Sequence, residues 1–161
     1  MYYNSGGEIM QAFEKEFSRA ARWYCKRGEA IMEMLPVAKE VDARGQLRYV
    51  KLSPFDVYGI QLGSGKFLGG ELKSYKSHRL GIGGTSGVKL HQMVALRDFH
   101  ICGGLVFIWW KHFDEVVRLT VPEIMEIKKI DGKKSIPWEL AKGIGTLIPF
   151  ENGIYKVLHE I

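Results

Sequence analysis

The strongest constraint on the fold is an unbroken apolar run, Leu105 to Trp110, which is the longest in the chain. Side chains of a strand point alternately to its two faces, so this segment is apolar on both faces. Such runs are typical of strands that are buried on both sides of a sheet. The run is far too short for a membrane span, which needs about 20 apolar residues. It therefore predicts a buried strand from Cys102 to Trp110.

Helical and extended patterns alternate along the rest of the chain. Apolar residues recur at helical spacing from Ile9 to Tyr24, which predicts a helix from Glu8 to Lys26, and a second helix is expected from Val88 to His100. The other expected elements are strands at 30–35, 47–52, 55–62, 66–75, 115–119 and 154–158, a polar turn or projection at 39–46, and helical turns at 122–127 and 137–141. This order predicts an α/β fold with a central mixed sheet flanked by helices. The 161 residues suit a single domain.

Composition sets weaker limits on partners and location. The formal net charge is +5 and the sequence pI is about 9.2, a modest excess that favours polyanionic partners. The two cysteines, Cys25 and Cys102, lack the paired spacing of a zinc site, and we expect buried free thiols in a reducing compartment. The first residues lack an apolar signal core, so a soluble, cytoplasmic protein without membrane contact is expected.

Candidate chemistry lies in the hairpin expected from residues 55 to 75. Gly63, Ser64 and Gly65 supply the backbone angles of a tight turn. Folding about the Gly63–Ser64 bond places position 56 opposite position 71, and opposed side chains lie about 5 Å apart. Asp56 and Glu71 should therefore converge. Because side chains alternate along a strand, Lys73 should share the face of Glu71.

Two neighbouring carboxylates repel each other unless a cation lies between them. Magnesium prefers oxygen ligands, and a bound ion can activate water for attack on a phosphodiester. A lysine beside the ion can orient that water or offset charge on phosphorus. The alternative from the residues alone is a solvent-exposed ladder of ion pairs without catalytic function.

The runs Ser53-Pro54-Phe55-Asp56 and Gly70-Glu71-Leu72-Lys73 resemble the motif of the PD-(D/E)xK nuclease superfamily. Flanking segments, in the same order, are similar to those of RecU-type Holliday junction resolvases, from about Gly6 to Tyr155. The similar segments are Phe13–Phe17, Asp56–Gly59, Glu71–Lys73, His91–Gln92, Gly103–Phe107 and Gly132–Ile136. Pro54 stands where this family often has a hydroxyl residue, and the stretch 37–53 is shorter than the family's projecting stalk.

This resemblance implies a restriction-endonuclease-like core and a homodimeric, magnesium-dependent endonuclease that resolves four-way DNA junctions in recombination and repair, with manganese as a possible substitute. Asp56 and Glu71 would bind the metal together with the backbone carbonyl of Leu72. Lys73 would orient the attacking water and stabilise the transition state. Gln92 would position Lys73 or the water, and Glu14 would complete the outer shell.

Basic residues near these positions are candidates for DNA binding. One set is expected around the hairpin and the glycine-rich loop 81–87 and consists of Lys66, Lys76, Arg79 and Lys89. A second set forms a stripe on the first helix and consists of Arg19, Arg22 and Lys26. Either set could instead be a solvated surface, and the loop could be a plain connector.

Other readings of the sequence are less consistent with its motifs. The stretch Gly59 to Lys66 lacks the spacing of a phosphate-binding Walker loop, and Ser86 replaces the third glycine of a dinucleotide-binding loop. Trp109, Trp110 and Trp138 are expected in the core, with a subunit interface as the alternative. Two rival functions stay open: another PD-(D/E)xK endonuclease that cuts ordinary duplex, and a DNA-binding module without catalysis.

Overall fold

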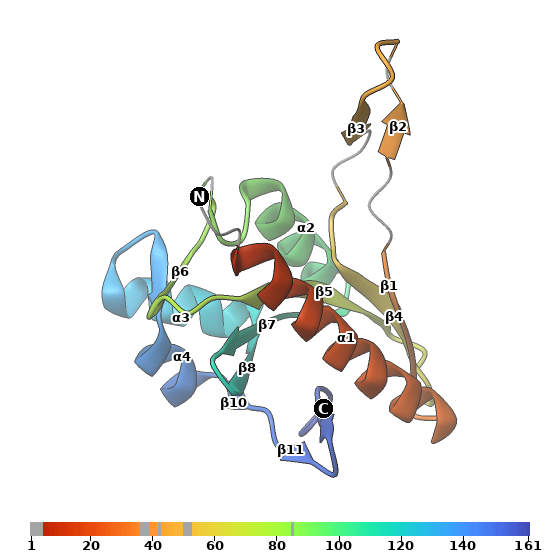
Figure 1. The fold of residues 1–161 in the computed structure, drawn as a ribbon. Helices are drawn as coiled ribbons and strands as arrows, with labels where there is room; N and C mark the ends of the chain where they lie inside the picture. The colour runs from red at the N-terminus through yellow and green to blue at the C-terminus, as the bar shows by residue number, and fades with distance from the viewer. Residues whose placement is uncertain (1–4, 36–38, 42, 50–52, 85) are drawn as a thin grey trace.

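A computed structural model describes residues 5–35, 39–41, 43–49, 53–84 and 86–161 (Figure 1). Its central sheet has the strand order β1–β4–β5–β7–β8–β10. The strands are β1 (Ala30–Met34), β4 (Val57–Gln61), β5 (Phe67–Ser74), β7 (Leu105–His112), β8 (Glu115–Thr120) and β10 (Thr146–Leu147). β5 and β7 are parallel and the other neighbours are antiparallel, so the predicted mixed sheet is confirmed.

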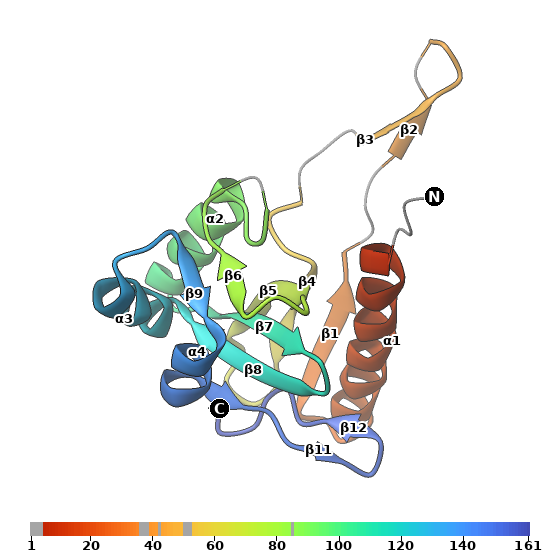
Figure 2. The same cartoon turned by 60° about the vertical axis from the view of Figure 1, so that its left-hand side comes forward.

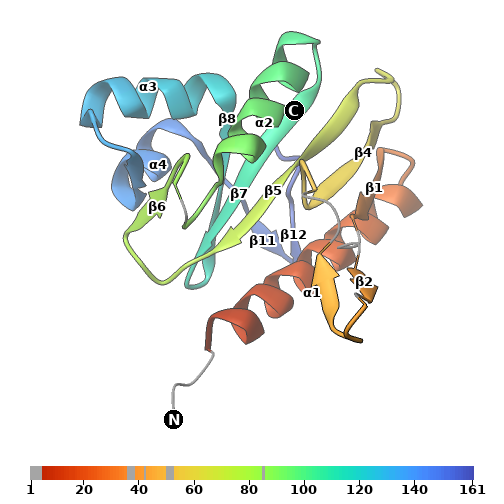
Figure 3. The ribbon, with the colours of Figure 1, turned by 90° about the horizontal axis from the view of Figure 1, so that it is seen from above.

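Helices cover both faces of this sheet (Figure 3). Helix α1 (Ser5–Lys26) packs on one face, where Phe13, Phe17 and Trp109 are fully buried. The other face packs against α2 (Leu90–Ile101), α3 (Val121–Asp131) and α4 (Trp138–Ile144). The two apolar clusters explain why β7 is apolar on both sides. Within the described part of the chain, no helix is long and apolar enough to cross a membrane.

Local sequence accounts for the ends of α3. The Thr120 hydroxyl accepts a hydrogen bond from the Glu123 amide, and the Glu123 carboxylate accepts one from the Thr120 amide. Pro122 lies in the first turn, where its missing N–H costs no helical hydrogen bond. Gly132 ends the helix in the left-handed conformation. The helix is therefore longer than the predicted segment 122–127.

Among the described residues, three two-stranded ladders accompany the main sheet. β2 (Lys39–Val41) and β3 (Leu47–Tyr49) form the expected projection, which stands away from the sheet in Figure 2, although the remainder of the predicted strand 47–52 lies outside the described residues. β6 (Arg79–Gly81) pairs with β9 (Ser135–Pro137), and β11 (Phe150–Glu151) pairs with β12 (Ile154–Tyr155). The last predicted strand, 154–158, is therefore only partly extended and does not belong to the central sheet.

The expectation of buried cysteines was wrong, because both Cys25 and Cys102 are exposed. Cys25 follows the buried Tyr24, and one residue of helix turns a side chain by about 100° away from the core. Cys102 forms the C-cap of α2, next to the exposed Ile101. The expectation for the three tryptophans is confirmed, since each is at most 3% exposed.

Candidate functional site

The predicted register of the β4–β5 hairpin is confirmed. Val57 lies opposite Gly70 and Ile60 lies opposite Phe67, so continuing the register places Asp56 opposite Glu71. The amide of Asp56 donates to the carbonyl of Gly70 at 3.0 Å. The site therefore lies at the open end of the hairpin, away from its turn.

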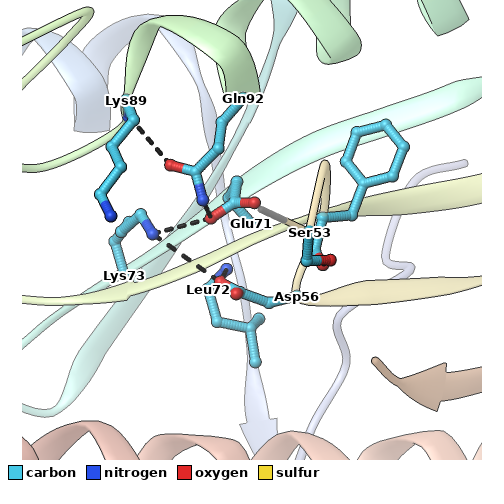
Figure 4. Close-up of polar contacts among 8 residues, drawn as sticks. Ser53, Asp56, Glu71, Leu72, Lys73, Lys89 and Gln92 are labelled. Atoms are coloured by element: carbon cyan, nitrogen blue, oxygen red, sulfur yellow. Dashed lines mark hydrogen bonds and ion pairs between the residues drawn. The ribbon is translucent and has the colours of Figure 1, made fainter. Parts of the chain in front are cut away.

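Asp56, Glu71 and Lys73 converge as predicted (Figure 4). The Nζ of Lys73 lies 2.7 Å from Oε2 of Glu71 and 3.7 Å from Oδ2 of Asp56. Glu71 and Lys73 are buried, at 0% and 7% exposed, whereas the Asp56 side chain is 31% exposed. This arrangement differs from a solvent-exposed ladder, because two of its three ionisable side chains are removed from water.

Gln92, in the first turn of α2, joins this group through Glu71. Its Nε2 donates to Oε2 of Glu71 at 2.6 Å, and its Oε1 accepts from the amide of Lys89 at 2.9 Å. Gln92 is only 8% exposed. The side chain thus orients the buried carboxylate, a contact that differs from the expected one with Lys73 or water.

Burial perturbs the ionisation of Glu71 and its neighbours. Desolvation and then the charge of Asp56 raise the pKa of Glu71 to about 8, with Lys73 opposing the shift. Desolvation and Asp56 also raise the pKa of Glu14, on α1, so this residue lies within electrostatic range of the site. Burial lowers the pKa of Lys73, but Glu71 and Asp56 outweigh it and the net shift is upward.

The donor set fits a hard divalent cation. Oε1 of Glu71 is buried and has no hydrogen-bond partner among the described residues. An unpaired buried oxygen of this kind is costly unless another group satisfies it. Together with the more exposed Asp56 it offers the oxygen ligands that magnesium prefers.

A backbone oxygen can complete this set. The amide of Leu72 donates to Oδ2 of Asp56 at 2.9 Å. The N–H and C=O of one residue in a strand point to the same side, so the Leu72 carbonyl is also directed to the Asp56 side. In the part of the chain that the structure describes, no three His, Cys, Asp or Glu side chains group as a metal site. Two carboxylates, this carbonyl and waters are thus the ligands available.

The predicted DNA-binding residues do not form one cluster. Lys66 lies at the turn end of β5, seven residues before Lys73, which corresponds to about 23 Å of strand. Lys76 and Lys89 are exposed and have no ion pair with any described residue. The Arg79 guanidinium donates to Oγ of Ser135 at 2.8 Å and forms an ion pair with Asp131. Arg79 therefore connects β6 to the end of α3, so its charge is already paired within the protein. The sequence did not predict this contact.

Two further predicted regions have defined surroundings. Arg19 and Arg22 are exposed on α1 and line a groove that also contains Glu14 and Asp56. Lys15, which was not among the predicted DNA-binding residues, lines the same groove. Backbone hydrogen bonds hold the ends of the glycine-rich loop in place. The amide of Gly83 donates to the carbonyl of Val88, and the amide of Ile82 donates to the carbonyl of Lys134.

Comparison with known proteins finds no family model that matches this chain and no similar protein among curated ones.

Proposed function

We propose that this chain is a metal-dependent DNA endonuclease that resolves four-way junctions. The observation that supports it most is the convergence of Asp56, Glu71 and Lys73 around a buried carboxylate oxygen that has no described partner. This combination of an acidic pair and an ammonium group suits hydrolysis of a phosphodiester. The resemblance to RecU-type resolvases supplies the junction as substrate.

Each residue has a role that its position allows. Asp56, Glu71 and the Leu72 carbonyl would hold magnesium or manganese. When bound, such an ion polarises a phosphoryl oxygen and lowers the pKa of water. Lys73 is held by Glu71 within 3.7 Å of Asp56, so its ammonium offsets negative charge that develops on phosphorus and orients the attacking water.

Residues around this centre fix its geometry. Gln92 holds Glu71 in one orientation from the first turn of α2. Glu14 approaches from α1 and completes the outer shell of the site. A four-way junction has approximate two-fold symmetry and needs paired nicks, so a homodimer with two such sites matches the substrate.

A labelled synthetic four-way junction, incubated with and without magnesium, tests this proposal. The wild-type protein should nick opposite strands in pairs only when magnesium is present, leaving 5′-phosphates. Asp56→Asn should abolish cutting while junction binding persists, because the substitution removes one metal ligand and keeps the side-chain shape. Asp98→Asn, at an exposed aspartate on α2, is the matched control and should cut normally.

Two outcomes would replace the proposal with its rivals. Equal cutting of matched linear duplex would indicate an endonuclease of another specificity. Junction binding without cutting by the wild-type protein would indicate a DNA-binding module.

A further inference from the structure

A groove of about 940 Å³ runs along α1 and reaches the candidate site. Glu14 and Asp56 line it near the catalytic residues, and Arg22 lines it two helical turns farther along α1. A second hollow, of about 300 Å³, shares Ser18, Arg22 and Met34 with the first and continues beside β1. The two hollows therefore make one surface path that leads away from Asp56.

Within the first hollow the charges change from acidic to basic along α1. Glu33, whose carboxylate accepts a hydrogen bond from the Tyr58 hydroxyl, lines the second hollow. Lys15, Arg19 and Arg22 are exposed and form no ion pair with any residue the structure describes. Glu16 also lines the groove, but its Oε2 forms an ion pair with Nζ of Lys111 at 2.6 Å. Beyond Glu14 and Asp56, the groove thus presents three cations that have no ion pair with a described residue.

Their spacing matches a polyanionic strand. Lys15, Arg19 and Arg22 follow each other at i+4 and i+3, so neighbouring side chains lie about 5–6 Å apart on one helix face. The three positions span about 10 Å of helix. Phosphates on one DNA strand rise about 3.4 Å each along the axis, so this stretch accommodates about three of them. Small or apolar residues line the rest of this groove and leave room for the sugar edge of a strand: Ala12, Ser18, Met34 and Leu35.

We infer that this groove binds the DNA strand next to the cut bond, on one side of it, with Lys15, Arg19 and Arg22 on successive phosphates. That the bound polyanion is DNA rests on the proposed function. In this arrangement the basic residues of α1 contact one strand near the cut, and they do not simply attract DNA over the whole helix.

Lys26 provides the control that separates these two possibilities. It continues the same stripe one turn beyond Arg22, is exposed, and is not part of the groove lining. If the attraction is diffuse, removing the charge of Lys26 should weaken junction binding as much as removing that of Arg22. If the strand lies in the groove, only the loss of Arg22 should weaken binding.

The experiment measures junction binding by fluorescence anisotropy over a series of salt concentrations, without divalent ions. The slope of log K against log salt should fall by about 0.7–0.9 in Arg22→Gln, which corresponds to one lost phosphate contact. Arg19→Gln should behave alike, and Lys26→Gln should keep the wild-type slope. Equal losses in Arg22→Gln and Lys26→Gln, an unchanged slope in Arg22→Gln, or no junction binding at all would overturn the inference.

A junction with one neutral methylphosphonate near the cut locates the contact. Neutralising the phosphate that Arg22 binds should weaken the wild-type complex, and Arg22→Gln should be insensitive to the same replacement. If Arg22→Gln stays sensitive at every position tested, the groove does not hold this strand. Because binding is measured without cutting, wild-type binding with these slopes but no cleavage would refute the proposed function and leave the groove assignment standing.

Discussion

Glu71 is a fully buried carboxylate whose ionised form is opposed by desolvation and by Asp56. Lys73 and Gln92 both contact its Oε2, which leaves Oε1 for a further ligand. In an ordinary surface ion pair, both charged groups stay in contact with water, whereas Glu71 does not. The cost of ionising Glu71 in the protein interior therefore supports the proposal that this carboxylate binds a divalent cation.

This cost predicts how stability depends on pH. The pKa of Glu71 in the folded chain is about 8, above the ordinary 4.5, so between these values the folded state holds a proton that the unfolded state has lost. The free energy of unfolding should then decrease as pH rises, by at most about 1.4 kcal/mol per pH unit. Glu71→Gln removes this titration. Without divalent ions, the melting temperature of the variant minus that of wild type should increase between about pH 5 and pH 8.

Thermal unfolding at several pH values measures this difference. Glu126→Gln, at an exposed glutamate on α3, is the matched control and should show a constant offset. A constant offset for Glu71→Gln as well would show that Glu71 does not bind a proton on folding.

At the scale of elements, β1 and β4 approach each other closely at Gly59. A Cβ atom at this position would lie 1.9 Å from the carbonyl oxygen of Ile31, a backbone atom that cannot move without displacing the strand. Asp56 directly precedes β4, and β1 borders the groove along α1. The packing of this strand pair therefore sets the position of the exposed carboxylate.

Gly59→Ala should destabilise the protein by about 1–3 kcal/mol, the usual cost of overpacking. Gly143→Ala is the matched control, because a Cβ there meets nothing within 4 Å and alanine favours the helix by up to about 1 kcal/mol. Urea unfolding measures both effects. Equal stability of the two variants would mean that β1 and β4 can separate at no cost.

The sequence predicted those elements whose signals are local. The turn at Gly63 and Ser64 set the register of β4 and β5, and helical periodicity located α1. The β6–β9 ladder escaped prediction, because each strand has three residues and more than fifty residues separate them. Its stabilising contact, between Arg79 and Asp131, is equally remote in sequence.

The same distinction explains what could be predicted of the site. Asp56, Glu71 and Lys73 lie on one hairpin, so strand alternation sufficed to bring them together. The bond from Gln92 to Glu71 depends on how α2 packs against β5, which no local pattern specifies. The groove could not be predicted either, because it forms only where α1 lies beside the end of β1.

The layers of the fold converge on one corner of the protein. The sheet supplies the carboxylates and the lysine, α2 supplies Gln92 from one face, and α1 supplies Glu14 together with the basic groove. The two helices lie on opposite faces of the sheet, yet both reach the open end of the β4–β5 hairpin (Figure 3). We propose that this corner binds a divalent cation.

Calorimetric titration with magnesium or manganese, without DNA, measures whether this corner binds the ion. The wild-type chain should bind a single ion, and Asp56→Asn should bind it at least about tenfold more weakly, since one of two carboxylate ligands is lost. Asp114→Asn, which alters an aspartate outside the site, should bind like wild type. Equal stoichiometry and affinity in wild type and Asp56→Asn would contradict the account.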